Sequence, residues 1–398
     1  MSDEFDLSRL LRPLSPEHFF AAHWEREPLR LQRGDRSYYD SLLTRANLEQ
    51  YLSSADARYP AIRLARSGAF YPPEAYTRDV KYGDEVFRGV PDVEKIFTEY
   101  MSGATVTLPG LHRTWPPLGR LCTRLESELD HSVHTNAYLT PPRASGFTPH
   151  YDTHEVFVLQ IAGVKHWRIY PPPLTLPHRS QTFSPDRYEL PGTPLMEFDL
   201  AAGDLLYLPR GYVHTTTARE SSSAHVTIGI TVYTWVELLS ELLQSSVDLP
   251  ELRAALPPGF AHRPQVQEQL SQRLGELIDR VRVSADTAAV SERLIARVRS
   301  LKARPPTRFQ TDPAEIEPDS RLRVADGIEY RVLREGESLI LELAGRRVRL
   351  QSAVAPTLEA ACRAESFTAR SLASDLSLDA RLALLRYLHG LGFLQRLE

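Results

Sequence analysis

The chain has 398 residues, a formal net charge of -4 and 42% hydrophobic residues, a composition typical of a soluble globular protein of two or three domains. The mild acidity gives no general reason to expect nucleic-acid binding, and the lack of a run of about 18 apolar residues argues against a membrane span. Cys122 and Cys362 lie far apart, which excludes a disulfide framework and a paired thiolate metal site. The acidic start "MSDEFDLSRL" does not resemble a secretory signal, so we expect a cytoplasmic protein.

The first element expected from the pattern is a short helix followed by an extended segment, within "SPEHFFAAHWEREPLRLQR". Ser15 is suited to cap the helix, and Pro16 is suited to its first position. Phe19, Phe20 and Trp24 would form its apolar stripe.

From about residue 104 to residue 233 the pattern becomes typical of strands. "VHTNAYLTPP" alternates, so His134, Asn136, Tyr138 and Thr140 are expected on one face. "VFVLQI" and "VKHWRIY", joined by Ala162-Gly163, are interpreted as a hairpin. Two further strands in "MEFDLAAGDLLYLPRGYVH" and a β-branched strand in "HVTIGITVYTW" follow. Many short antiparallel strands with Gly and Pro turns predict a barrel or jelly roll.

After Trp235 the pattern becomes helical and then mixed. Three short strands and terminal helices after a Pro-rich break, "ARPPTRFQTDP", predict a small winged-helix-type module at the C-terminus. Helical spacing between these parts gives two apolar stripes. The first stripe is Leu270, Leu274, Leu277, Ile278 and Val281, and the second is Val290, Leu294, Val298 and Leu301.

His150 and Asp152 are separated by one tyrosine in "TPHYDTHEV". Residues i and i+2 of a strand point to the same face, so an imidazole and a carboxylate can converge even where strand geometry only begins. "GDLLYLPRGYVH" offers a third group, because His214 follows a strand and a Pro-Gly turn at the predicted barrel mouth. Two histidines and one carboxylate on one side of a metal form the facial triad of non-haem Fe(II) oxygenases. Zinc is the chemical rival for the same ligands.

Other basic side chains lie near this set. His154 is also two residues from Asp152 and is expected at the rim of the site, and His166 is expected to face away from Lys165. For His225 a core histidine with satisfied hydrogen bonds is favoured over a donor to the metal ligands. Lys165 either extends to solvent or meets an anion inside the barrel. The local pattern alone favours a Lys165 that extends to solvent. A metal triad near Lys165 would instead favour contact with an anionic cosubstrate.

These residues lie in a longer pattern that resembles the JmjC-type ribosomal oxygenases, a family of cupin-fold Fe(II)/2-oxoglutarate-dependent protein hydroxylases. The resemblance rests on "NAYLTPPRASGFTPHYDTHEVFVLQIAGVKHWRIYPP" followed by "GDLLYLPRGYVH". "FFAAHWEREPLRLQR" is similar to the family's N-terminal segment, so the resemblance covers about residues 15–236. It implies a mainly β fold, a double-stranded β-helix (cupin/JmjC jelly roll) with N-terminal α/β elements. It also implies Fe(II) as the metal, with 2-oxoglutarate and O2 as cosubstrates.

The resemblance implies roles for single residues at the metal centre. His150, Asp152 and His214 match the iron ligands, and these are the expected catalytic residues. Lys165 matches the residue that binds the distal carboxylate of 2-oxoglutarate. The implied reaction is hydroxylation of a C–H bond, with 2-oxoglutarate converted to succinate and carbon dioxide.

The resemblance implies two further contacts and a domain order. Asn136 matches a position on the cosubstrate side of the pocket, and Tyr138 matches one on the substrate side. The segment 219–223 departs from the family's wording, so no cosubstrate contact is carried over to the strand that follows. The expected domains are an oxygenase domain at 1–236, a helical dimerisation region at 237–304 and a winged-helix-type domain at 305–398.

Three functions remain open on the sequence. The leading one is hydroxylation of a His or Arg side chain of a ribosomal protein, and the second is hydroxylation of another peptide or a free amino acid in specialised metabolism. The third is a DNA-binding regulator with a cupin sensor domain. Residues 359–398 hold five arginines and five acidic residues, so no basic face and no direct DNA binding are expected. We expect a homodimer in which the two helical stripes are buried between copies.

Overall fold

The computed structural model describes residues 5–53, 58–83, 85–190, 192–302, 316–325, 328, 330–336, 338–343 and 346–397. The chain divides into two compact units, Met1–Val232 and Tyr233–Glu398. The domain boundary expected at residue 304 falls within residues 303–315, which lie outside the described residues. Within the described part, every helix is too short or too polar to cross a membrane.

The N-terminal helix and extended segment form as predicted. Ser15 Oγ accepts a hydrogen bond from the His18 N–H at 3.3 Å, and Pro16 occupies the first position of α2. Phe19 is fully buried and packs against the ring of Phe157. The elements are α1 (Leu7–Leu11), α2 (Pro16–Ala22), β1 (Leu29–Leu31) and α3 (Arg45–Leu52).

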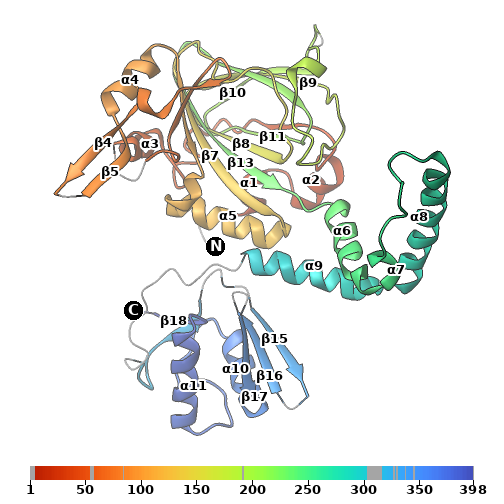
Figure 1. The fold of residues 1–398 in the computed structure, drawn as a ribbon. Coiled ribbons are helices and arrows are strands. Elements are labelled where there is room, and N and C mark those ends of the chain that lie inside the picture. Colours follow the sequence, from red (N-terminus) through yellow and green to blue (C-terminus); the bar gives the residue numbers. More distant parts are fainter. Residues whose placement is uncertain are drawn as a thin grey trace. The chain divides into compact units, whose positions relative to one another are not determined.

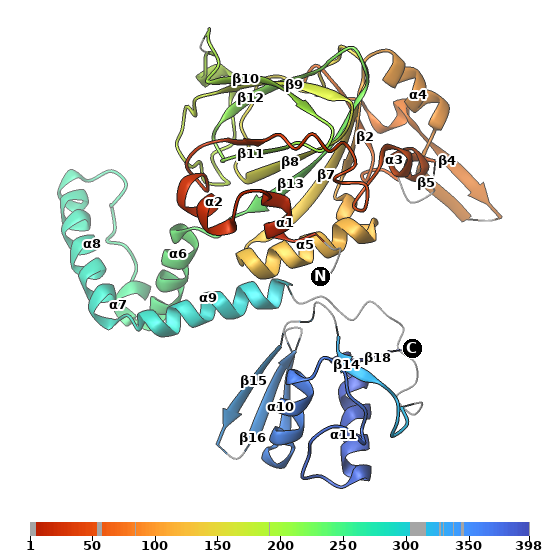
Figure 2. The same ribbon diagram turned by 180° about the vertical axis from the view of Figure 1, so that it is seen from behind.

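Unit 1 is built around two antiparallel sheets, and its described residues give the following strands. The large sheet runs in the order β1, β11 (Leu205–Leu208), β8 (Glu155–Ala162), β13 (Ser223–Thr231), β7 (Ser132–Thr140), β6 (Thr105–Pro109), β2 (Arg63–Arg66) and β3 (Ala69–Phe70). The small sheet runs in the order β10 (Met196–Ala201), β9 (Val164–Tyr170) and β12 (Val213–Ala218). From β8 onward the chain passes repeatedly between the sheets, which is a double-stranded β-helix, and both views show the sheets facing each other (Figures 1 and 2). The predicted jelly roll is confirmed.

The predicted hairpin of β8 and β9 is wrong. In the described residues β8 pairs with β11 and β13 in the large sheet, whereas β9 pairs with β10 and β12 in the small one. Gly163 permits this change of sheet, because its φ is 68° and a Cβ there would lie 2.0 Å from the Ser222 carbonyl oxygen. Two strands around a glycine turn have the same local pattern in a hairpin and in a sheet crossing, so periodicity could not separate the two.

Strand β8 lies between two apolar cores. Phe157, Leu159 and Ile161 point into a core shared with the helices on the outer face of the large sheet. Val156 and Val158 point into a second core between the two sheets. Both faces are covered, which explains why the run "VFVLQI" is apolar without alternation. The remaining elements of unit 1 are a hairpin of β4 (Thr77–Tyr82) and β5 (Glu85–Pro91), and the helices α4 (Val93–Met101) and α5 (Pro116–Leu129).

Unit 2 contains a helical part and a small α/β part. The helices are α6 (Trp235–Ser245), α7 (Pro250–Arg253), α8 (Pro264–Ser284) and α9 (Thr287–Lys302), of which α6 and α9 pack together. The α/β part has its own apolar core, formed by α10 (Ala355–Arg363), α11 (Leu378–Gly390) and the inner faces of two small sheets. One sheet pairs β14 (Leu322–Val324) with β18 (Leu394–Arg396), and the other is the meander β15 (Tyr330–Glu335), β16 (Ser338–Leu343) and β17 (Arg346–Gln351).

Candidate active site

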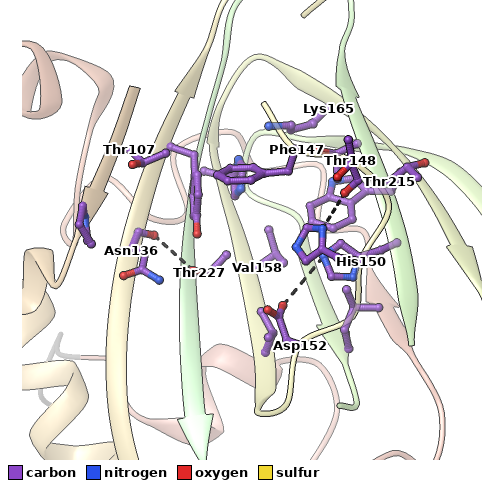
Figure 3. A pocket seen from close by; sticks show the side chains of 18 of the residues that line it. Thr107, Asn136, Phe147, Thr148, His150, Asp152, Val158, Lys165, Thr215 and Thr227 are labelled. Atoms are coloured by element: carbon purple, nitrogen blue, oxygen red, sulfur yellow. Dashed lines mark hydrogen bonds and ion pairs between the residues drawn. The ribbon is translucent and has the colours of Figure 1, made fainter. Parts of the chain in front are cut away.

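A cavity of about 370 Å³ lies between the two sheets of unit 1. Side chains from β7, β8, β9, β12 and β13 line it, together with the segment before β8. In Figure 3, Lys165 and Asp152 lie toward opposite ends of the view, with His150 between them. The cavity therefore brings together residues that are far apart in the chain.

The three predicted metal ligands meet in this cavity. The ligand atoms of His150, Asp152 and His214 all lie within 4.8 Å of one another, and they are the one such group found in the described part of the chain. His214 Nε2 lies 3.9 Å from a carboxylate oxygen of Asp152. Residues 151–154 do not form a strand, so alternation alone does not aim the ligands. An isolated backbone bridge between His150 and His214 brings the two ligands together, and in it the His214 N–H donates to the His150 carbonyl oxygen at 2.9 Å.

Two backbone carbonyls orient the histidine rings. His150 Nδ1 lies 2.8 Å from the Thr148 carbonyl oxygen, and His214 Nδ1 lies 3.2 Å from the Tyr212 carbonyl oxygen. A carbonyl can only accept, so each Nδ1 carries a proton, and in the neutral ring Nε2 offers a lone pair. The rings therefore present the nitrogen that a metal requires.

The charges of the three groups also suit a cation. Burial, followed by the nearby His150, lowers the pKa of His214 to about 4, so this ring is neutral at pH 7. Burial acts to raise the pKa of Asp152, but the surrounding histidines, His154 foremost, outweigh it and lower the pKa. At neutral pH the set therefore contains a carboxylate and the neutral imidazole of His214, a combination that fits Fe(II).

Lys165 points into the cavity and not to solvent. Its side chain is 3% exposed, and its Nζ donates to Thr140 Oγ1 at 2.9 Å. Thr140 in turn accepts from Thr105 Oγ1 at 3.2 Å. Burial lowers the pKa of Lys165 to about 7. The solvent-exposed alternative for Lys165 is therefore wrong, because the side chain is buried. No carboxylate among the described residues pairs with it, an environment that suits an anion.

Asn136 and Tyr138 line the cavity from the same face of β7, as the alternation predicts. The Gly110 N–H donates to Asn136 Oδ1 at 3.1 Å, so Asn136 can act toward the cavity only through its amide N–H groups, which also interact with the Tyr138 hydroxyl. Burial raises the pKa of Tyr138 to about 12, so its hydroxyl remains protonated. Both residues therefore offer hydrogen-bond donors.

The other histidines divide into two groups. His154 lines the cavity beside Asp152, as expected. His166 faces away and bonds Asp199 and Glu197, also as expected. His225 is different, since the satisfied core histidine favoured by the pattern is wrong. Its ring lines the cavity, stacks on Tyr138 at 4.8 Å between centroids, and has an Nδ1 without a hydrogen-bond partner among the described residues.

Sequence reasoning missed an aromatic wall on the substrate side. Phe147 contacts the rings of Tyr138, Phe70 and His150, with centroids 5.9 to 6.0 Å apart. Arg63 lines the same part of the cavity. Phe147 lies within the motif "GFTPHYD", but Phe70 and Arg63 come from the distant β2–β3 region, where no local signal marks them.

Comparison with known proteins matches residues 112–238 to the JmjC domain family. The chain is 34% identical to "Ribosomal oxygenase 1" of Gallus gallus over 258 residues, which is 62% of this chain and 41% of that protein. It is 30% identical to the "Bifunctional lysine-specific demethylase and histidyl-hydroxylase NO66" of Drosophila persimilis over 357 residues, 86% of this chain and 50% of that protein. The chain thus spans about half the length of the curated relatives it matches.

Solved structures show the same fold. The ribosomal oxygenase YcfD of Escherichia coli matches with a TM-score of 0.51 at 18% identity, over 96% of this chain and 98% of that one. A second structure of YcfD, in complex with cobalt and 2-oxoglutarate, matches with a TM-score of 0.52. Residues 112–238 therefore carry a JmjC domain, and the chain is similar to ribosomal oxygenases in sequence and in fold.

Proposed function

We propose that this chain is a cytoplasmic Fe(II)- and 2-oxoglutarate-dependent dioxygenase that hydroxylates an amino-acid side chain of a ribosomal protein. One observation carries the proposal. A two-histidine, one-carboxylate set lies in the same cavity as a buried lysine that has no carboxylate partner in the described part of the chain. Relatives named ribosomal oxygenases support the substrate class, and the complex of Escherichia coli YcfD with 2-oxoglutarate supports the cosubstrate. Cys122 and Cys362 form no disulfide in the described part of the chain, which agrees with a reducing compartment.

The residues of the cavity would have separate roles in binding the metal, the cosubstrate and the target. His150, Asp152 and His214 would hold Fe(II) from one side and leave its remaining positions open. The Lys165 ammonium would bind the distal carboxylate of 2-oxoglutarate, with Thr140 orienting it. Oxidation of a C–H bond is the chemistry that Fe(II) and 2-oxoglutarate supply when bound. The enclosed wall of the cavity would exclude water and position the target carbon near the metal.

The cavity favours histidine over arginine as the target residue. A guanidinium has only donors, whereas a neutral imidazole also has an acceptor. Asn136 presents donors to the cavity, which suit an imidazole nitrogen or a cosubstrate carboxylate and repel a guanidinium. Asp152 is the one carboxylate among the described residues that line the cavity, and it is committed to the metal set, while Lys165 and Arg63 are cations. A buried guanidinium would therefore lack a counter-ion.

Mass spectrometry of ribosomal proteins tests the function. Strains with the gene, without it, and with an Asp152→Ala version are compared. We expect one ribosomal protein to carry an additional oxygen atom on a histidine only in the first strain, because the third strain lacks a metal ligand. An additional oxygen on an arginine would contradict the choice of target. No gene-dependent oxygen on any ribosomal protein would contradict the substrate class.

Unit 2 supports two further proposals. The first is a helical dimerisation region at residues 237–304. Trp235, Leu239 and Leu243 form an exposed stripe on α6, and Leu274 and Ile278 are each 59% exposed on α8. The second stripe expected to face a partner is partly wrong, because Val290 and Val298 of α9 are buried within the chain. The side chain of Leu301 lies outside the described residues. A homodimer would therefore use the exposed stripes of α6 and α8.

The second proposal is a winged-helix-type module at residues 305–398 that does not bind DNA directly. Several arginines among the described residues of this module are engaged within it. Arg381 donates to the carbonyl oxygens of Ala369 and Leu372, and Arg370 pairs with Asp319. Guanidinium groups held in this way do not form the basic face that a DNA reader needs. A docking or structural role fits this charge distribution.

Exchange of two exposed residues of α8 for lysine should produce a monomer. In a Leu274→Lys/Ile278→Lys variant, charges would replace the apolar side chains that a second copy covers. We expect light scattering to show a dimer for the parent and a folded monomer for the variant. Gln272→Lys, on an exposed position of the same helix, is the matched control and should remain a dimer. A parent that is monomeric at micromolar concentration would refute the interface.

A further inference from the structure

The metal ligands lie near the starts of two strands. His150 and Asp152 belong to the irregular segment before β8, and His214 is the second residue of β12. Residues 148–154 precede β8, and residues 209–212 precede β12. The segments are joined by the His150–His214 bridge and by the Gly211 N–H, which donates to the Asp152 carbonyl oxygen at 3.0 Å. Strand pairing with β9 places His214, but Asp152 lies outside the strands, so nearby side-chain contacts help to set the spacing of the ligands.

A buried ion pair joins the same two segments. Arg210 Nη1 lies 2.7 Å from Glu155 Oε1, and the side chains are 5% and 0% exposed. Glu155 follows Asp152 by three residues, and Arg210 precedes His214 by four. The Tyr207 hydroxyl donates to the other oxygen of the Glu155 carboxylate. The pair is outside the cavity lining, so it does not contact the reactants directly.

The pair also reaches the N-terminal segment. Arg210 Nη1 forms a second ion pair with Glu25, whose φ of 58° lies in the left-handed region. The Glu25 N–H donates to the Tyr207 hydroxyl at 3.0 Å. Three stretches that are distant in sequence therefore converge on one guanidinium.

Stability is a poor explanation for this arrangement. A buried ion pair loses much of its Coulomb energy to desolvation, and apolar residues of similar volume are often as stable. An ion pair with fixed hydrogen bonds instead fixes the relative position of the two chain segments, because a guanidinium and a carboxylate bond in few geometries. A fixed position is useful for Asp152, because this ligand lies outside the strands.

We propose that Glu155 and Arg210 are positioning residues of the metal centre, which hold the segments of Asp152 and His214 at the spacing that a metal ion requires. The inference rests on the proposed binding of a metal by the triad. In this proposal Tyr207 holds the Glu155 carboxylate, and Glu25 holds the Arg210 guanidinium. Its consequence is a protein that folds without the pair but binds metal weakly.

Manganese binding to full-length variants tests the inference without a turnover assay. A Glu155→Met/Tyr207→Phe/Arg210→Met variant removes the buried polar groups together. We expect it to melt near the parent temperature but to bind Mn(II) about ten- to hundredfold more weakly, measured by the electron paramagnetic resonance signal of free Mn(II). The absorption spectrum of bound Co(II) should also change, because the ligand geometry changes. Arg210→Lys keeps the charge without the fork and should bind Mn(II) with an affinity between those of the parent and Arg210→Met.

The controls separate the possible failures. Arg143→Met/Glu220→Met removes an exposed ion pair of the same unit and should leave Mn(II) affinity unchanged. A triple variant that melts like the parent and binds Mn(II) as tightly would overturn the inference. If the triple variant does not fold, the melting temperature and Mn(II) affinity of Glu155→Gln and Arg210→Lys are compared with those of the parent instead. Parent-like values of both quantities would overturn the inference. A parent that does not bind Mn(II) would contradict the proposed function, which is a different outcome.

Discussion

Replacing Asp152 by alanine will remove metal binding and, with it, the conversion of 2-oxoglutarate to succinate. Asp152 is the one carboxylate of the set, and its ligand atom lies within 4.8 Å of those of His150 and His214. Two neutral imidazoles without this negative charge form a much weaker site for a hard or borderline cation. The loss should exceed the ten- to hundredfold effect typical of residues that only support ligands. Titration with Mn(II) and a succinate assay measure the two effects.

The control for this variant is another histidine or carboxylate position that is outside the cavity. His166 lies on the opposite face of β9 and bonds Glu197 and Asp199 near the surface, so His166→Ala should bind metal like the parent. Replacing His214 by alanine should resemble Asp152→Ala. If Asp152→Ala protein binds Mn(II) as tightly as the parent, the assignment of the triad is wrong.

Replacing Lys165 by methionine will weaken 2-oxoglutarate binding and leave metal binding nearly intact. A charge-assisted hydrogen bond contributes about 1.5 to 3 kcal/mol, which corresponds to a loss of roughly ten- to hundredfold in affinity. Methionine retains the apolar volume of the stem, so the β9 packing should survive. Calorimetric titration of the Mn(II)-loaded proteins with 2-oxoglutarate gives the affinity, and Lys95→Met, at an exposed surface position, is the matched control.

The same variant should also remove a pH dependence. In the free protein, burial lowers the pKa of Lys165 to about 7, and a bound carboxylate would raise it. Below pH 7 the lysine is already charged, so its contribution to binding does not change with pH. Above pH 7 binding must take up a proton, and affinity falls by up to about tenfold per pH unit until the pKa of the bound state is reached. We expect this fall for the parent and a smaller one for Lys165→Met. Equal affinity and equal pH dependence of the two proteins would refute the role of Lys165.

The identity of the metal set and the fold class could be predicted from the sequence because their signals are local. His150 and Asp152 lie two residues apart, and His214 follows its own turn motif, so residue type and spacing indicate the chemistry. Alternation along β7 placed Asn136 and Tyr138 on one face, and the structure confirms it, because the side-chain period of a strand depends only on its backbone.

The partners of those strands and the environment of the buried charges depend on contacts between distant residues. Whether β8 and β9 pair or separate into two sheets is decided by β11, β13, β10 and β12, which come later in the chain. The burial of Lys165 follows from that crossing, since a β9 in the small sheet directs this side chain inward toward Thr140. His225 joins the cavity because Tyr138, on a neighbouring strand, stacks on its ring. The Glu155–Arg210 ion pair likewise exists only once the start of β8 meets the turn before β12. Residue type and local periodicity are properties of a short stretch of chain, whereas desolvation and pairing are set by whatever the rest of the chain places beside it.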